Sequence, residues 1–137
     1  MLELIPKRTW IANAIEIRDA RKLFDAGIEA VVDVAYEEPP ASLPRQLIHC
    51  RYPLNDGGGN SAASIRAAVL GAAELMRNNL ATIIACSAGK SRSPIVTAFA
   101  LAALDGESPQ TVLERIATQR PLQLNPLLWN DVVAALN

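Results

Sequence analysis

An arginine, Arg92, stands six residues after Cys86, and the segment between them is built mostly from small side chains. These residues are Ser87, Ala88, Gly89, Lys90 and Ser91. Small side chains let consecutive backbone N–H groups turn toward one point, and a helix that follows adds its positive N-terminal end. The guanidinium of Arg92 supplies a planar fork that matches two phosphate oxygens. The segment therefore predicts a binding site for a phosphate-sized anion.

Cys86 lies at the mouth of this predicted site. An ordinary cysteine is only a few per cent thiolate at neutral pH, and the thiolate is the nucleophilic form. We expect the oriented amides and Arg92 to favour the thiolate of Cys86. The same short segment then holds both an anion site and a nucleophile.

The period of the apolar residues changes several times along the chain and predicts the elements that position this segment. We expect strands at Leu2–Ile5, Trp10–Ala12, Ala30–Val34, Leu47–Leu54 and Leu80–Cys86. We expect helices at Asp19–Ala26, Ser64–Asn78, Pro94–Leu104, Pro109–Gln119 and Pro126–Leu136. Alternating strands and helices indicate an α/β fold with a central, largely parallel, twisted sheet of four to five strands flanked by helices. Ligands of such sheets bind outside the carboxyl ends of the strands, which is where Cys86 ends its strand.

Three dipeptides of the same kind mark helix starts: Ser93-Pro94, Ser108-Pro109 and Asn125-Pro126. In each, a side chain that can accept from free helix amides precedes a proline, which needs no N–H partner at the first helical position. The three consecutive glycines in residues 55–61 exclude regular structure, because they carry a large entropy cost of ordering. We expect a mobile loop there.

The composition excludes several classes of protein. Half of the 137 residues are hydrophobic, a fifth are charged, and the net charge of −1 gives the whole chain no electrostatic attraction for nucleic acid. One histidine and two cysteines exclude a multi-histidine zinc centre and a disulfide framework. Pro94–Leu104, the longest apolar stretch, would rise only about 16 Å as a helix, roughly half of a bilayer core. We expect a single cytoplasmic domain over residues 1–137, with no membrane span.

The sequence Cys86 to Ser93, CSAGKSRS, resembles the signature loop of the cysteine-based protein tyrosine phosphatases. The resemblance extends along nearly the whole chain, through the segments RTWIANAIE, GIEAVVDV, YPLNDGGGN and QRPLQLNPLLW. The chain resembles a small dual-specificity phosphatase catalytic domain. This resemblance implies that fold, and a substrate that is a phosphorylated protein or a small phosphomonoester.

The resemblance also implies roles for individual residues. Asp56, thirty residues before Cys86, matches the family's general acid, and the departure of an alkoxide or phenoxide does require a proton. The implied reaction has two steps: Cys86 forms a cysteinyl-phosphate, and water activated by Asp56 then hydrolyses it. Arg92 and the amides of residues 87–91 hold the phosphate oxygens, Ser93 stabilises the returning thiolate, and no metal or cofactor takes part.

Alternative interpretations of these residues stay open at the level of sequence. Asp56 precedes glycine and is also typical of a turn, and Ser93 is also a helix cap. Lys90 either contacts substrate or is solvated at the tip of the loop. Arg120 lies either near the site, as in the family, or in a salt bridge. Cys50 is an ordinary strand residue or a redox partner of Cys86.

One position departs from the family pattern. The family has histidine directly before the nucleophile, where it helps to order the loop, and this chain has Ala85. The departure keeps two alternatives to a protein phosphatase open: a phosphate-binding module with little or no turnover, and a phosphatase of phosphoinositides or other polyanions. Lys90 favours a polyanion, whereas the Glu37-Glu38 pair opposes one if its loop borders the cleft.

Overall fold

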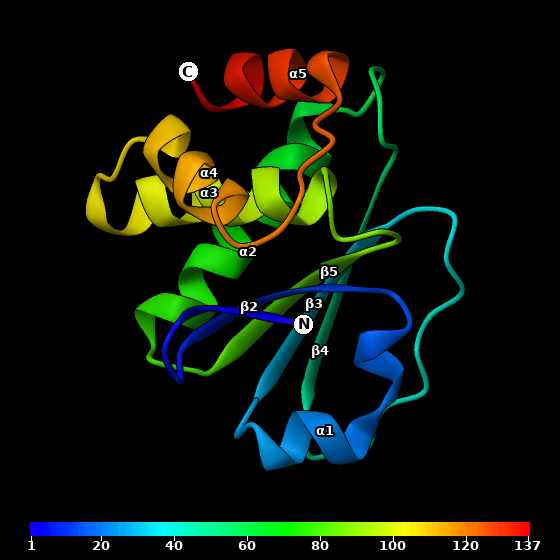
Figure 1. Ribbon diagram of the computed structural model, residues 1–137. Coiled ribbons are helices and arrows are strands. Elements are labelled where there is room, and N and C mark those ends of the chain that lie inside the picture. Colours follow the sequence, from blue (N-terminus) through cyan, green and yellow to red (C-terminus); the bar gives the residue numbers. More distant parts are fainter.

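The computed structural model describes residues 1–137, which form five strands and five helices (Figure 1). The strands are β1 (Leu2–Ile5), β2 (Thr9–Asn13), β3 (Ala30–Ala35), β4 (Ile48–Leu54) and β5 (Thr82–Cys86). The helices are α1 (Ala20–Asp25), α2 (Ala62–Arg77), α3 (Arg92–Asp105), α4 (Pro109–Ala117) and α5 (Pro126–Leu136). Every element expected from the sequence is present, and the ends differ by a few residues. A short 3-10 turn at Glu16–Arg18 was not predicted.

The strands form one sheet in the order β1-β2-β5-β3-β4. β2, β5, β3 and β4 run parallel, and only β1 is antiparallel to its neighbour β2. The predicted largely parallel sheet of an α/β fold is therefore confirmed. Because β5 is central, Cys86 at its end is flanked by Asn13 of β2, its register partner, and by the last residues of β3, where Asp33 pairs with Ala85.

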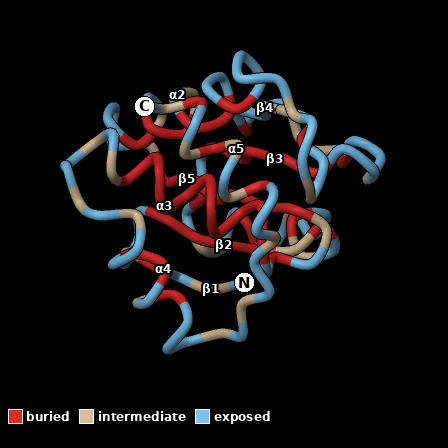
Figure 2. The backbone as a smooth tube through the Cα atoms, turned by 90° about the horizontal axis from the view of Figure 1, so that it is seen from above, coloured by how far each residue is buried: buried red, intermediate tan, exposed pale blue.

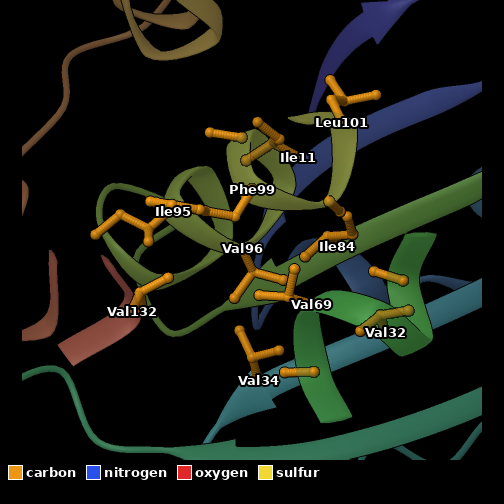
Figure 3. Close-up of a cluster of buried hydrophobic side chains, with 14 of the residues drawn as sticks. Ile11, Val32, Val34, Val69, Ile84, Ile95, Val96, Phe99, Leu101 and Val132 are labelled. Atoms are coloured by element: carbon orange, nitrogen blue, oxygen red, sulfur yellow. The ribbon is translucent and has the colours of Figure 1, made fainter. Parts of the chain in front are cut away.

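Alternate residues of the strands face two separate apolar clusters, one on each side of the sheet. In β5, Ile84 belongs to the larger cluster, under α2, α3 and α5, and Ile83 belongs to the smaller one, under α1. Figure 1 shows α2 to α5 gathered on one side of the sheet and α1 on the other. Figure 3 shows residues of the larger cluster, where strand side chains such as Val32 and Ile84 meet Val69 of α2 and Val96 of α3.

Helix α3 is buried from Arg92 through Leu101, which explains why Thr97 is the single polar residue between Pro94 and Leu101. In Figure 2 the buried colour runs along β2, β3, β5 and most of α3, while the outer loops are exposed. No helix of the chain combines the length and apolar character needed to cross a membrane. Because α3 begins at Arg92 and is buried through Leu101, its first turn connects the candidate site directly to the core.

Two of the three predicted caps are confirmed. The Ser108 side chain accepts from the amide of Thr111, and the Asn125 side chain accepts from the amides of Leu127 and Leu128. The cap predicted at Ser93 is wrong: α3 begins two residues before Pro94, with Ser91 in the N-cap position. The reason is that the turn after Cys86 is tight enough for the helix to start at Arg92. This leaves the Ser93 hydroxyl inside the first helical turn.

Candidate active site

The segment from Cys86 to Arg92 forms a tight loop at the carboxyl edge of the sheet, between β5 and α3 (Figure 1). Gly89 has φ of +71°, a conformation that favours glycine. A Cβ at Gly89 would also lie 3.0 Å from the carbonyl oxygen of Ala12 in β2. The amide of Ala14 donates to the carbonyl of Ser87 at 3.2 Å, so β2 braces the loop along its back.

The Cys86 thiol lies on the inner side of this loop and is 2% exposed. The amide of Gly89 donates to Cys86 Sγ at 3.2 Å, and Ser93 Oγ lies 3.3 Å from the same sulfur. The sulfur therefore has two hydrogen-bonding neighbours, one backbone amide and one hydroxyl. The contact with Ser93 is available because Ser93 does not cap the helix.

Four amides of the loop donate to no protein acceptor. They belong to Ser87, Ala88, Lys90 and Ser91, whereas the amide of Gly89 is used by the sulfur. Consecutive free N–H groups at the start of a helix attract anions, because partial positive charge gathers there. The structure thus provides the donors that the small side chains of this segment predict.

The guanidinium of Arg92 is 3% exposed and is held from one side. Its Nη1 donates to Glu37 Oε1 at 2.5 Å and to the carbonyl of Leu54 at 2.8 Å, and its Nη2 donates to Glu37 Oε2 at 2.8 Å. Of the five N–H groups of a guanidinium, two remain: Nε–H, which is buried without a partner, and the second Nη2–H. These two share one edge, which suits two oxygens of a phosphate.

The electrostatics of this pair stabilise both charges. The hydrogen bonds from Arg92 lower the pKa of Glu37 from 4.5 to about 2. Burial opposes the charge on Arg92, but its hydrogen bonds to Glu37, together with Cys86 and Asp56 nearby, raise the pKa of the guanidinium above its usual value. Arg92 is therefore a permanent cation in a site closed to solvent on one side.

Asp56 lies across a cavity of about 230 Å³ from this loop. The cavity is lined by Glu37, Asp56, Cys86, Ser87, Ala88, Lys90, Ser91, Arg92 and Gln123. The Asp56 carbonyl accepts from Asn125 Nδ2 at 2.9 Å, and the Asn60 side chain bonds the backbone of Asn55 and Gly57. Residues 55–61, expected to be mobile, are thus cross-linked by side-chain hydrogen bonds.

Two residues that line the cavity were missed by the sequence interpretation. Gln123 reaches it because its amide donates to the Lys90 carbonyl at 3.0 Å, and the Asn125 amide donates to Ser91 Oγ at 3.0 Å. Glu37 was noted only for its charge, whereas its contact with Arg92 spans 55 residues of sequence. In the sequence, the adjacent acidic residues Glu37 and Glu38 in a proline-rich loop were the only indication that this segment borders the site.

Three further residues with open alternatives are now located. Lys90 is exposed and lines the cavity, so it can reach a bound ligand. Arg120 donates to the carbonyl of Ile11 at 3.3 Å and is in no salt bridge, so the predicted salt bridge is wrong. Arg120 also lies close to Gly89: a Cβ added at Gly89 would be 3.3 Å from Arg120 Nη2.

Cys50 lies on β4, as the strand interpretation predicted, and β3 separates it from β5. Val32 is the register partner of both Cys50 and Ile84, so Cys50 is two strands away from Cys86 and two residues out of level with it. Two strand spacings are about 9.6 Å, which exceeds the reach of a disulfide. The fold therefore excludes direct pairing of the two cysteines. Ala85 is fully buried in the smaller apolar cluster, on the side of the sheet opposite to the thiol.

Neither a family model nor a curated protein sequence matches the chain. Solved structures do. Human DUSP28 superposes with a TM-score of 0.85 at 20% identity, covering 98% of this chain and 94% of that chain. PTPMT1 in complex with PI(5)P gives 0.74 at 16% identity, covering 94% and 90%. OH1 from the Orf virus, described as a tyrosine phosphatase with triple substrate specificity, gives 0.71 at 18%, covering 98% and 82%.

The TM-scores show that the matched structures share the overall fold of this chain. At such identities the similarity concerns the fold, and the chemistry of the site depends on this chain's own residues. The chain therefore has, over nearly its full length, the fold of the dual-specificity phosphatases.

Proposed function

We propose that the protein is a cysteine-dependent phosphomonoester hydrolase. The observation that carries the proposal is the convergence of unpaired donors on one sulfur-lined cavity. Four loop amides and the free edge of Arg92 surround Cys86, and none of them has a protein acceptor. The buried Nε–H of Arg92 is costly to leave without a partner, and an anion with several oxygens would satisfy it together with the free loop amides.

In the first step, the Cys86 thiolate attacks phosphorus in line with the leaving oxygen. A bond forms between sulfur and phosphorus, the phosphorus–oxygen bond to the leaving group breaks, and protonated Asp56 gives its proton to the departing oxygen. Arg92 and the four free amides, those of Ser87, Ala88, Lys90 and Ser91, hold the remaining three oxygens, whose charge they stabilise.

In the second step, water attacks the phosphocysteine. Asp56, now a carboxylate, takes a proton from the water, and the sulfur–phosphorus bond breaks to release inorganic phosphate. The electron pair returns to Cys86, where the hydroxyl of Ser93 and the amide of Gly89 donate to the thiolate from 3.3 and 3.2 Å.

The substrate class that fits best is a monophosphate on a protein, either phosphotyrosine or phosphoserine and phosphothreonine. Two carboxylates, Glu37 and Asp56, line the cavity beside one exposed lysine, Lys90. A phosphoinositide with several phosphates would bring additional negative charge toward these carboxylates. We therefore place protein and small monophosphates ahead of polyanions.

Hydrolysis of a generic aryl phosphate, measured with and without a chelator, tests the proposal. We expect turnover that the chelator does not change, and complete loss of turnover in Cys86→Ser with phosphate binding retained, because a serine hydroxyl is un-ionised at neutral pH. Cys50→Ser, at the half-buried second cysteine, serves as a matched control. Full activity of Cys86→Ser would exclude the nucleophile, and phosphate binding without turnover in the unmodified protein would indicate a binding module.

A further inference from the structure

The loop after β3 is wrapped around a single nitrogen of Arg51. Arg51 Nη2 donates to the carbonyls of Ala35 at 3.3 Å, Tyr36 at 3.2 Å and Glu38 at 2.9 Å. Two of these carbonyls belong to the residues directly before and after Glu37. The backbone on both sides of Glu37 is therefore fixed to one side chain of the neighbouring strand.

Arg51 is itself held by the buried start of the same loop. It is the register partner of Asp33, whose side chain is 3% exposed, and its Nε lies 3.9 Å from Asp33 Oδ2. The other oxygen of Asp33 accepts from the amide of Ala35 at 3.0 Å. The pairing of β3 with β4 is irregular between Asp33 and Ala35, and the chain leaves the sheet after Ala35, where β3 ends.

Glu37 needs this support because its surroundings do not confine it. Its side chain is 54% exposed, whereas that of its partner Arg92 is 4% exposed. An exposed glutamate loses considerable rotamer entropy when it is held in one two-point contact. When the backbone of Glu37 is fixed, its carboxylate has fewer conformations available, so the entropy cost of forming the contact with Arg92 is smaller.

We propose that Arg51, supported by Asp33, is a positioning residue for the phosphate-binding arginine. It acts through Glu37: Arg51 fixes the backbone around Glu37, Glu37 occupies the outer face of the Arg92 guanidinium, and the free edge of Arg92 is thereby directed at the loop amides. The importance of Arg51 for catalysis rests on the proposed function. The direct consequence of its positioning role is tighter binding of a phosphate anion.

A double-mutant cycle tests the path of this effect. The measured quantity is the dissociation constant of inorganic phosphate, determined by calorimetry with the full chain. We expect Arg51→Met to weaken phosphate binding about tenfold, and to change it less than twofold when Glu37→Ala is already present. The loss of Tm caused by Arg51→Met should be similar in both backgrounds, since the packing of Arg51 on the loop does not require the Glu37 carboxylate.

Two further variants sharpen the result. Arg51→Lys retains an ammonium with three donors, so it should recover part of the affinity, and it replaces Arg51→Met in the cycle if that variant does not fold. Arg45→Met removes an exposed arginine from the same loop and should leave phosphate affinity within twofold.

Equal losses of affinity in the two backgrounds would overturn the positioning role, even if the protein hydrolyses phosphomonoesters. Coupled losses without any turnover would support the positioning role and refute the proposed hydrolase. Absence of phosphate binding in the unmodified protein would refute both.

Discussion

Glu37 and Arg92 form a two-point ion pair with contacts of 2.5 and 2.8 Å, although 55 residues separate them. The pair occupies one edge of the guanidinium and leaves the Nε–H, which is buried without a partner, on another edge. The main effect of the contact with Glu37 is to fix the orientation of the Arg92 guanidinium. A cation that could rotate freely would bind an anion without presenting two parallel donors to it.

Arg92→Lys should therefore be severely impaired although it preserves the charge. A lysine ammonium cannot bond Glu37 at two points and also present an edge with two donors to phosphate. We expect kcat on an aryl phosphate to fall on the order of 10²- to 10³-fold. Arg115→Lys is a matched control, because Arg115 of α4 makes a similar two-point pair with Glu107, which precedes that helix. Comparable losses in the two variants would assign Arg92 to folding alone.

Asp56→Asn tests the general acid. We expect turnover to fall about 10²- to 10⁴-fold on alkyl or tyrosyl phosphates, and much less on an ester whose leaving group is already acidic. The ratio of kcat for the two substrates is the measurement, since an effect on loop structure would lower both equally. Asp25→Asn, an exposed residue at the end of α1, provides the control.

The Glu37–Arg92 pair should also be visible in stability at acid pH. The pKa of Glu37 is about 2 in the folded protein and 4.5 as an ordinary carboxyl, so the unfolded chain binds the proton first. The ionised carboxylate stabilises the fold above pH 4.5, and this stabilisation is lost as the pH falls toward 2. Urea unfolding of the wild type and Glu37→Gln should give free energies that differ most above pH 4.5 and converge at lower pH. A constant difference from pH 7 to pH 2.5 would contradict the assignment.

Ala85→His would restore the family pattern before the nucleophile, but the structure predicts that the ring does not fit. Ala85 is 1% exposed and packs in the smaller apolar cluster. Overpacking of a buried position costs about 1–3 kcal/mol, so we expect Tm to fall by several degrees in a thermal melt. A Tm that stays constant or rises would show that the cluster has room for an imidazole, and a gain in kcat could then be tested in the same variant.

The sequence allowed the local part of the site to be predicted, because its parts are contiguous. Cys86, Gly89 and Arg92 lie within one turn between a strand and a helix, and the types of their side chains are tied to that geometry. The same holds for the caps at Ser108 and Asn125, where a side chain and the amides that it accepts from are three residues apart or fewer. Such features depend on backbone conformation alone.

The remainder of the site depends on tertiary placement. Glu37 and Gln123 reach the cavity from loops whose paths follow from the order of the strands and from single hydrogen bonds such as that from Gln123 to Lys90. Ser93 was misassigned as a cap because serine before proline is a strong local signal, and the tight turn after Cys86 overrode it. The spacing of residues along the chain predicts neither the placement of Glu37 and Gln123 at the cavity nor the position of Ser93 inside the first turn of α3.

Helix α3 gives the protein a particular thermal behaviour. Its first residue is Arg92, and it remains buried through Leu101. The end of the helix at the proposed anion site and the part in the centre of the core therefore belong to one continuous helix. The hydrogen-bonded amides from Ile95 to Leu101 should exchange only through global unfolding, in the same cooperative unit as the central strands. Local opening of the chain ends and outer loops should then leave the loop between β5 and α3 in place. The protein should keep its anion site intact up to the temperature at which the whole molecule melts.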